Sequence, residues 1–247
     1  MTFASIDHLV GSGTPASRPR VAVSSCLLGI NVRYDGGHRR EAFVADVLGP
    51  RVDWIRVCPE VEIGLGTPRD PIDLHATGDP RRPKLLHGDR DLTSRMRSFA
   101  LGRIAELRAR EIDGYILKAR SPSCGLAHAR LVRPDGYVER VGTGIFAQAL
   151  KESWPELPMF DETDLDIPLV GLARAEWIFV MHRFRVGATD PEGLMRFHGE
   201  HEERIGLRDR DALPELRSVL ASAGEPSERI RQYARRLSRA FASIPAR

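Results

Sequence analysis

The sequence predicts an α/β fold: a Rossmann-like open parallel sheet with flanking helices, followed by a small all-α C-terminal region. Three short apolar runs, within 20–26, 53–58 and 114–117, have the composition of buried strands. A helical repeat separates the second run from the third, and this alternation favours parallel strands with right-handed crossovers. Beyond about residue 168, the apolar spacing indicates helices only.

Each of the three apolar runs leads into a cysteine. Cys26 ends RVAVSSC, Cys58 ends VDWIRVC, and Cys124 lies in the tight turn SPSCG that follows GYIL. Ligands of an open parallel sheet collect in the crevice outside the carboxyl ends of its strands. We therefore expect three strands that are far apart in the sequence to bring three thiols to one place.

Helices are expected between the strands. Residues 41–48 have apolar side chains at helical spacing, and Gly49-Pro50 is a stop signal. A longer helix should begin near Asp91 or Thr93, because apolar residues then recur every three or four positions. Residues 75–91 are rich in Gly, Pro and Arg, so we expect a mobile loop or a small hairpin there.

The chain after the third cysteine alternates again between strand and helix patterns. Residues 129–141 read as a short hairpin that turns at Pro-Asp-Gly, and a helix should follow from residue 145. Residues 158–160 resemble a last short strand. We therefore divide the chain into a flexible N-terminus (1–18), an α/β domain (19–168) and a helical region (169–247).

Four helices are expected in the C-terminal region. Asp190-Pro191 places a capping residue before a proline at the first helical position, which is a helix start signal. His198 and His201 lie three residues apart and could share a helix face. No third ligand lies close to them in the sequence, so we expect no metal site there.

Composition and charge limit the class of protein. The chain has 247 residues, of which 42% are hydrophobic, and this is enough for a substantial core. No apolar run reaches the length of a membrane span, and the N-terminus lacks a signal-peptide pattern, so we expect a cytoplasmic protein. The net charge of +3 is spread along the chain, which argues against dedicated nucleic-acid binding. A homo-oligomer is compatible with the sequence.

The three cysteines admit several interpretations. An odd number argues against a secreted disulfide scaffold and leaves inert core residues, metal ligands or nucleophiles. Structural zinc sites usually contain closely spaced cysteine pairs, and none exists here. The wide spacing suits ligands that a fold assembles. Three thiolates would leave one iron of a [4Fe-4S] cluster without a protein ligand and open to substrate.

Four sequence blocks carry a family resemblance. In order, CLLGINVRYDGGH, CPEVEIGLGTPR, GDRDLTSRM and LKARSPSCG resemble blocks of the thiouracil desulfidase family, over about residues 20–165. The resemblance implies an oxygen-sensitive [4Fe-4S] cluster held by Cys26, Cys58 and Cys124. It also implies non-redox removal of sulfur from a thiolated pyrimidine. CPEVEIGL and FHGEHEERIGLRD are similar to a branch with a helical C-terminal domain, which is shorter here.

The same resemblance suggests roles for further residues. Glu60 would act as general base and acid, activating water for attack on the thiocarbonyl carbon, although it could instead only cap the next turn. A serine of the SPSCG turn would orient the substrate. Ser121 is our candidate for a catalytic role and Ser123 for substrate binding, and either could be the orienting serine. Arg33 and Asp35 are candidates for the edge of the substrate pocket.

Three functions compete at this point. The first is an enzyme, a [4Fe-4S]-dependent desulfidase that hydrolytically releases the sulfur of a thiolated nucleobase such as 2-thiouracil as sulfide. A second enzyme would use the cluster to supply or traffic sulfide. The third is a structural or sensor protein, with an Fe-S cluster or zinc, whose helical tail binds a partner.

Overall fold

A computed structural model describes residues 17–79 and 82–243 of the chain. The predicted flexible segment, 1–18, lies almost entirely outside the described residues. Backbone contacts divide the chain into two compact units. Residues 20–155 and 159–163 form an α/β unit, and the second unit consists mainly of helices. Each unit is described by itself.

The α/β unit is built on a four-stranded sheet in which every neighbouring pair is parallel. Its order is β2-β1-β6-β9, and the strands are β1 (Arg20–Ser24), β2 (Asp53–Val57), β6 (Gly114–Leu117) and β9 (Met159–Asp161). Val21 pairs with Trp54 on one side and with Gly114 on the other. The predicted open parallel sheet is therefore confirmed.

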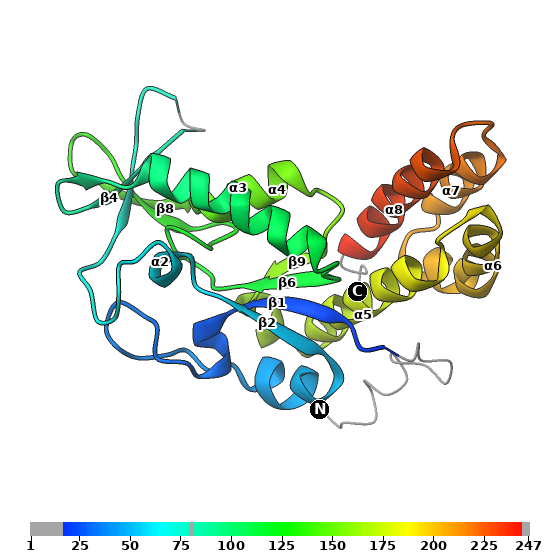
Figure 1. The fold of residues 1–247 in the computed structure, drawn as a ribbon, viewed down its shortest axis with the longest axis horizontal. Helices are drawn as coiled ribbons and strands as arrows, with labels where there is room; N and C mark the ends of the chain where they lie inside the picture. The colour runs from blue at the N-terminus through cyan, green and yellow to red at the C-terminus, as the bar shows by residue number, and fades with distance from the viewer. Residues whose placement is uncertain (1–16, 80–81, 244–247) are drawn as a thin grey trace. The chain divides into compact units, whose positions relative to one another are not determined.

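Helices flank this sheet on both faces. Figure 1 shows α3 and α4 on one face and the segment 43–51 on the other. The helical elements are η1 (Ser25–Leu28), the π-helix η2 (Phe43–Leu48), η3 (Gly49–Arg51), α2 (Pro59–Glu62), α3 (Thr93–Ala109) and α4 (Ile145–Ser153). The helices predicted from residue 41, near residue 93 and from residue 145 all form.

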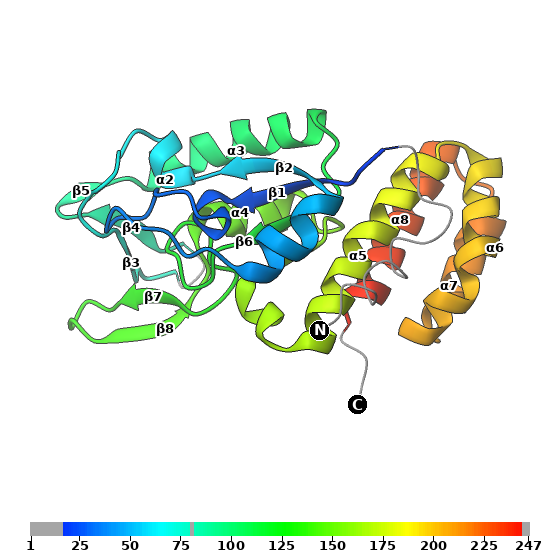
Figure 2. The same ribbon diagram turned by 90° about the horizontal axis from the view of Figure 1, so that it is seen from below.

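A second, five-stranded sheet completes the α/β unit in the order β5-β4-β3-β7-β8. Its strands are β3 (Asp73–His75), β4 (Lys84–His87), β5 (Arg90–Asp91), β7 (Ala129–Val132) and β8 (Val138–Gly142). The predicted hairpin is β7–β8, which Figure 2 shows clearly. Within the segment 75–91, β4 and β5 form the small hairpin that was expected from the composition, and β4 also pairs with β3 in the sheet.

The helical unit contains the predicted C-terminal helices. They follow η4 (Glu162–Asp166) and are α5 (Pro168–Gly187), α6 (Pro191–Arg208), α7 (Ala212–Ala221) and α8 (Pro226–Ala242). Asp190 caps α6 as predicted, since its Oδ1 accepts a hydrogen bond of 2.7 Å from the backbone N–H of Gly193. None of the helices in the described part of the chain has the length and hydrophobicity to span a bilayer.

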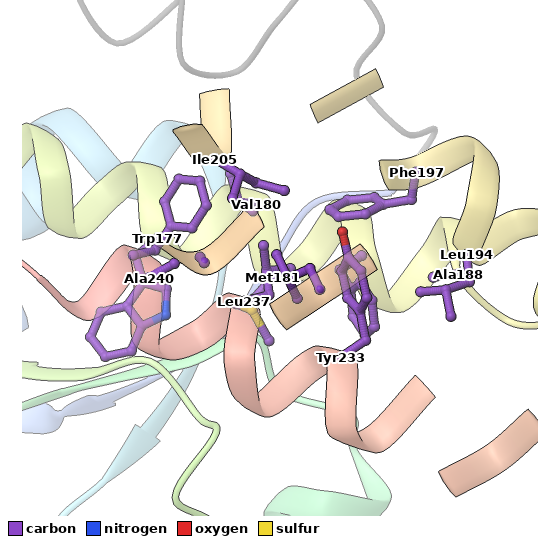
Figure 3. Packing of buried hydrophobic residues seen from close by; sticks show 14 residues of the cluster. Trp177, Val180, Met181, Ala188, Leu194, Phe197, Ile205, Tyr233, Leu237 and Ala240 are labelled. Atoms are coloured by element: carbon purple, nitrogen blue, oxygen red, sulfur yellow. The ribbon is translucent and has the colours of Figure 1, made fainter. Parts of the chain in front are cut away.

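Aliphatic and aromatic side chains together form the core of the helical unit (Figure 3). The rings of Phe184 and Tyr233 stack with centroids 5.5 Å apart, and Phe197 meets Tyr233 edge-on. Nδ1 of His198 lies 2.8 Å from Oη of Tyr233, and Nδ1 of His201 lies 3.0 Å from the carbonyl oxygen of Phe197. Each histidine therefore has its own partner within the fold.

Candidate active site

The three cysteines line one pocket of about 540 Å³ in the α/β unit. Cys26 lies in η1 directly after β1, Cys58 follows β2, and Cys124 lies in the turn after β6. Neighbouring parallel strands end at the same edge of a sheet, which explains why residues so distant in the sequence meet there. Cys26 and Cys124 are buried, and Cys58 is partly exposed.

The turn that carries Cys124 is held by its own serine. Oγ of Ser121 accepts hydrogen bonds of 3.1 Å from the backbone N–H groups of Ser123 and Cys124, and Gly125 N–H donates to the carbonyl oxygen of Ser121 at 2.9 Å. The turn is also joined to α4, because Gly144 N–H donates to the carbonyl oxygen of Gly125 at 2.8 Å. These bonds fix the direction in which the Cys124 thiol points.

Gly144→Ala should destabilise the turn. A Cβ atom at position 144 would lie only 2.4 Å from the carbonyl carbon and oxygen of Ser123. We expect the free energy of unfolding to fall by about 1–3 kcal/mol, as measured by urea denaturation. Gly102→Ala is the control, because a Cβ at this helical position meets nothing within 4 Å, and it should leave stability unchanged or increase it. Wild-type stability of Gly144→Ala would contradict the close contact.

Glu60 lies in α2 and reaches the same turn. Its Oε1 accepts hydrogen bonds from Oγ of Ser123 at 3.0 Å and from Oγ of Ser121 at 3.3 Å. Its Oε2 pairs with Nη2 of Arg69. The Glu60 carboxylate oxygens are the acceptors in all three contacts. The arrangement places a proton acceptor beside the three thiols.

The two candidate serines differ in their position. Ser121 lies in the lining of the pocket, so its hydroxyl can meet a bound molecule. Ser123 is fully buried and reaches the pocket only through Glu60. Ser123 therefore holds Glu60, and its contact with substrate stays a prediction.

Arg69 was not among the candidates from the sequence. Its side chain is only 3% exposed, and besides Glu60 it binds the carbonyl oxygens of Val32 at 3.0 Å and Gly66 at 2.7 Å through Nη1. Arg69 thus fixes the Glu60 carboxylate and joins two loops around the pocket. The residue ends the block CPEVEIGLGTPR, but no local pattern connects it with Glu60.

Arg33 and Asp35 occupy the loop after η1. Arg33 lines the pocket, and its Nη2 lies 3.3 Å from Oδ2 of Asp35. Asp35 also accepts a hydrogen bond from Gly37 N–H, and this bond, together with Arg33, holds the pKa of the Asp35 carboxyl below its usual value. Asp35 is not among the residues that line the described pocket but contacts Arg33, which is, and its place at the pocket edge stays a prediction.

The metal-free thiols are poor acids. Burial raises the pKa of the Cys26 thiol to about 12, although nearby Lys118 opposes the rise. Burial is also the main reason why the pKa values of Cys58 and Cys124 are raised. A metal that binds here must therefore displace protons from the thiols, as is usual for thiolate ligands.

The donor set includes the ligands of an iron-sulfur cluster. No group of three or more His, Cys, Asp or Glu side chains in residues 17–79 and 82–243 converges closely enough to form a metal site. Three thiols nevertheless line one pocket, and thiolates are the usual ligands of iron-sulfur clusters.

Comparison with known proteins identifies the family. The model of the 2-thiouracil desulfurase family matches residues 21–162, which is more than half of the chain and includes every candidate site residue. The chain belongs to the 2-thiouracil desulfurase family. This membership confirms the resemblance found in the sequence blocks and indicates a desulfurase enzyme. The match ends before α5, so the four long C-terminal helices lie outside the desulfurase region.

Two related proteins can be named. An uncharacterised protein of Bacillus subtilis, YbbK, is 29% identical over 142 residues, which are 54% of this chain and 90% of that protein. A solved structure of the [4Fe-4S]-dependent thiouracil desulfidase TudS has 31% sequence identity and a TM-score of 0.48. Its match covers 60% of this chain and 94% of the TudS chain.

Proposed function

We propose that this desulfurase is an iron-sulfur-dependent desulfidase that removes sulfur, as sulfide, from a thiolated nucleobase such as 2-thiouracil. One observation carries the proposal: three thiols line the same pocket as a carboxylate that two serines and an arginine hold in place. In the domain division that we propose, all of these residues lie in the desulfidase domain (19–168) rather than the helical region (169–247).

The three cysteines are the ligands in this proposal. A [4Fe-4S] cluster held by Cys26, Cys58 and Cys124 would supply an iron without a protein ligand, and such an iron is a Lewis acid toward a thiocarbonyl sulfur. The burial of Cys26 and Cys124 limits the access of water and oxygen to this side of the pocket. The Arg33 guanidinium, which also lines the pocket, is available to a substrate carbonyl oxygen as a hydrogen-bond donor.

Glu60 is the proposed base. It takes a proton from the water that attacks the thiocarbonyl carbon and returns it when the carbon–sulfur bond breaks, so sulfur leaves with no net oxidation or reduction. Ser123 and Arg69 hold the two carboxylate oxygens in place for this transfer. Ser121 faces the pocket and is the proposed contact to the substrate, with Arg33 beside it.

The experiment is a turnover assay on protein purified and reconstituted without oxygen. Iron and acid-labile sulfide are measured first, and the protein is then incubated with 2-thiouracil in the absence of any oxidant or reductant. We expect uracil and sulfide in equal amounts. A cluster-loaded protein that releases no sulfide from thiolated pyrimidines would refute the desulfidase and favour the structural or sensor protein.

A further inference from the structure

Lys118 brings an ammonium group to the pocket, and the function proposed above gives it no role. It follows β6 directly and lines the same pocket as Glu60 and the three cysteines. Its backbone N–H donates to Oγ of Ser24 at 2.9 Å, and Ser24 ends β1 two residues before Cys26. The Lys118 side chain is only 18% exposed, so its charge acts in surroundings less polar than water. A cation in such a place needs partners within the protein.

One carboxylate fixes the position of the ammonium. Nζ of Lys118 pairs with Oε1 of Glu162, and it also donates a hydrogen bond of 3.0 Å to the carbonyl oxygen of Ala119. Oε2 of Glu162 accepts from the backbone N–H of Ala119 at 2.7 Å, so both oxygens of Glu162 bind this short segment. In the described part of the chain, Lys118 is among the residues that line the pocket, and Glu162 is not. The pocket therefore contains the cation of this pair without its carboxylate.

The ammonium has one donor left for a molecule in the pocket. A lysine side chain carries three N–H groups and accepts no hydrogen bond. Two of the three donate to Glu162 and to the carbonyl oxygen of Ala119. Within residues 17–79 and 82–243, no other group accepts a hydrogen bond from Nζ. The third N–H is therefore free for an acceptor in the pocket that Lys118 lines.

Glu60 and Lys118 supply opposite charges to this pocket. Glu60 accepts hydrogen bonds from two serines and pairs with Arg69, so it suits the proton of an attacking water. Lys118 can only donate, so it suits an atom on which negative charge develops. When water attacks a thiocarbonyl carbon, that atom is the sulfur, because it takes the electron pair of the breaking carbon–sulfur bond. A cation that is already held in place stabilises such a charge without first rearranging.

We propose that Lys118 binds the departing sulfur: its free N–H donates a hydrogen bond to that atom as the carbon–sulfur bond breaks and then holds the hydrosulfide product. This inference rests on the proposed function and adds a ligand to the same site. Lys118 keeps its own protons, and no electron is transferred. One proton of the attacking water passes through Glu60 to the sulfur and the other is lost to solvent, so thiocarbonyl and water give carbonyl, hydrosulfide and a proton.

The test compares Lys118→Met with Lys84→Met in protein purified and reconstituted without oxygen. Methionine keeps most of the length of lysine but has neither its charge nor its N–H donors. Lys84 is the matched control, because it also pairs with a carboxylate, Asp91 at 3.5 Å, but its side chain is 59% exposed. We expect Lys118→Met to lower kcat for 2-thiouracil about 10²-fold with little change in KM, because the charge develops only as the bond breaks. Lys84→Met should match wild type.

Two further readouts distinguish the binding of sulfur from a structural role. Calorimetric titration of the loaded protein with sodium sulfide, without oxygen, should show about tenfold weaker binding in Lys118→Met than in wild type. Lys118→Ala leaves space for a small cation, so added methylammonium should restore part of its turnover. Tetramethylammonium carries the same charge but has no N–H donor, and it should not restore turnover.

The outcomes separate this inference from the proposed function. A loaded wild type that releases no sulfide from 2-thiouracil would overturn the function itself. With an active wild type, either wild-type turnover or wild-type sulfide affinity in loaded Lys118→Met would overturn the role of Lys118 alone.

A double variant covers the case in which Lys118→Met does not load, because the single change leaves Glu162 without its cation. Lys118→Met/Glu162→Gln removes both charges together. Low turnover and weak sulfide binding in the loaded double variant would support the proposal, and wild-type values would overturn it. If neither variant takes up a cluster, Lys118 serves assembly of the site rather than the departing sulfur, and the proposal is overturned.

Discussion

Glu60→Gln is expected to slow desulfuration about 10²–10⁴-fold while the cluster stays bound, because the amide cannot accept a proton from the attacking water. The substitution keeps the size of the side chain and an oxygen that can accept from Ser121 and Ser123. The rate of sulfide release from 2-thiouracil is the measurement, and iron content and the visible spectrum are recorded on the same sample.

A matched variant controls for the loss of a negative charge near the sheet. Glu106 lies on α3, its side chain is 64% exposed, and it pairs with Arg103. Glu106→Gln should retain wild-type activity. Should Glu60→Gln remain as active as Glu106→Gln, Glu60 is not the base, and its contacts with Arg69 and the serines serve only to shape the pocket.

Each of the substitutions Cys26→Ala, Cys58→Ala and Cys124→Ala is expected to remove most of the bound iron and all desulfuration. The proposed cluster has three protein ligands, and a site with two thiolates holds it too weakly to survive purification. Iron and acid-labile sulfide per chain, with the absorption near ~400 nm typical of thiolate-bound clusters, are the measurements. Wild type should contain about four irons per chain.

The chain has only three cysteines, so the triple alanine variant provides the baseline for adventitious iron. Replacing a buried cysteine side chain by the methyl group of alanine lowers the free energy of unfolding by on the order of 1 kcal/mol. The single variants should therefore stay folded, as circular dichroism can check. Full iron in one single variant would remove that cysteine from the site. Full iron in all three would exclude the shared site.

The sheet was predictable because its strands carry strong local signals. The runs that become β1 and β6 are largely apolar and buried, as strands buried on both faces are. In β2, the buried residues Ile55 and Val57 flank the exposed Arg56. Parallel strands end at a common edge, so the meeting of Cys26, Cys58 and Cys124 in one pocket follows from the strand pattern alone. Their role as ligands stays a prediction.

Features that depend on distant partners were not predictable. The five-stranded sheet includes β3, which is three residues long and pairs in parallel with β7 across more than fifty residues of chain. Arg69 has no sequence pattern of its own, because its place in the site follows from its contact with Glu60. Such contacts appear only when the fold is assembled.

The order of the strands in the sheet also determines the stage of chain synthesis at which the three thiols can come together. The backbone N–H of Arg20, at the start of β1, bonds to Oδ2 of Asp113, just before β6 and 93 residues later. Because synthesis runs from the N-terminus, a nascent chain exposes the thiols of Cys26 and Cys58 well before Cys124 exists. A complete set of three thiols therefore requires both the synthesis of the chain past Cys124 and the long-range pairing of β1 with β6. Delivery of the proposed cluster would therefore follow the synthesis of Cys124, and a truncated or stalled chain would hold two unprotected thiols.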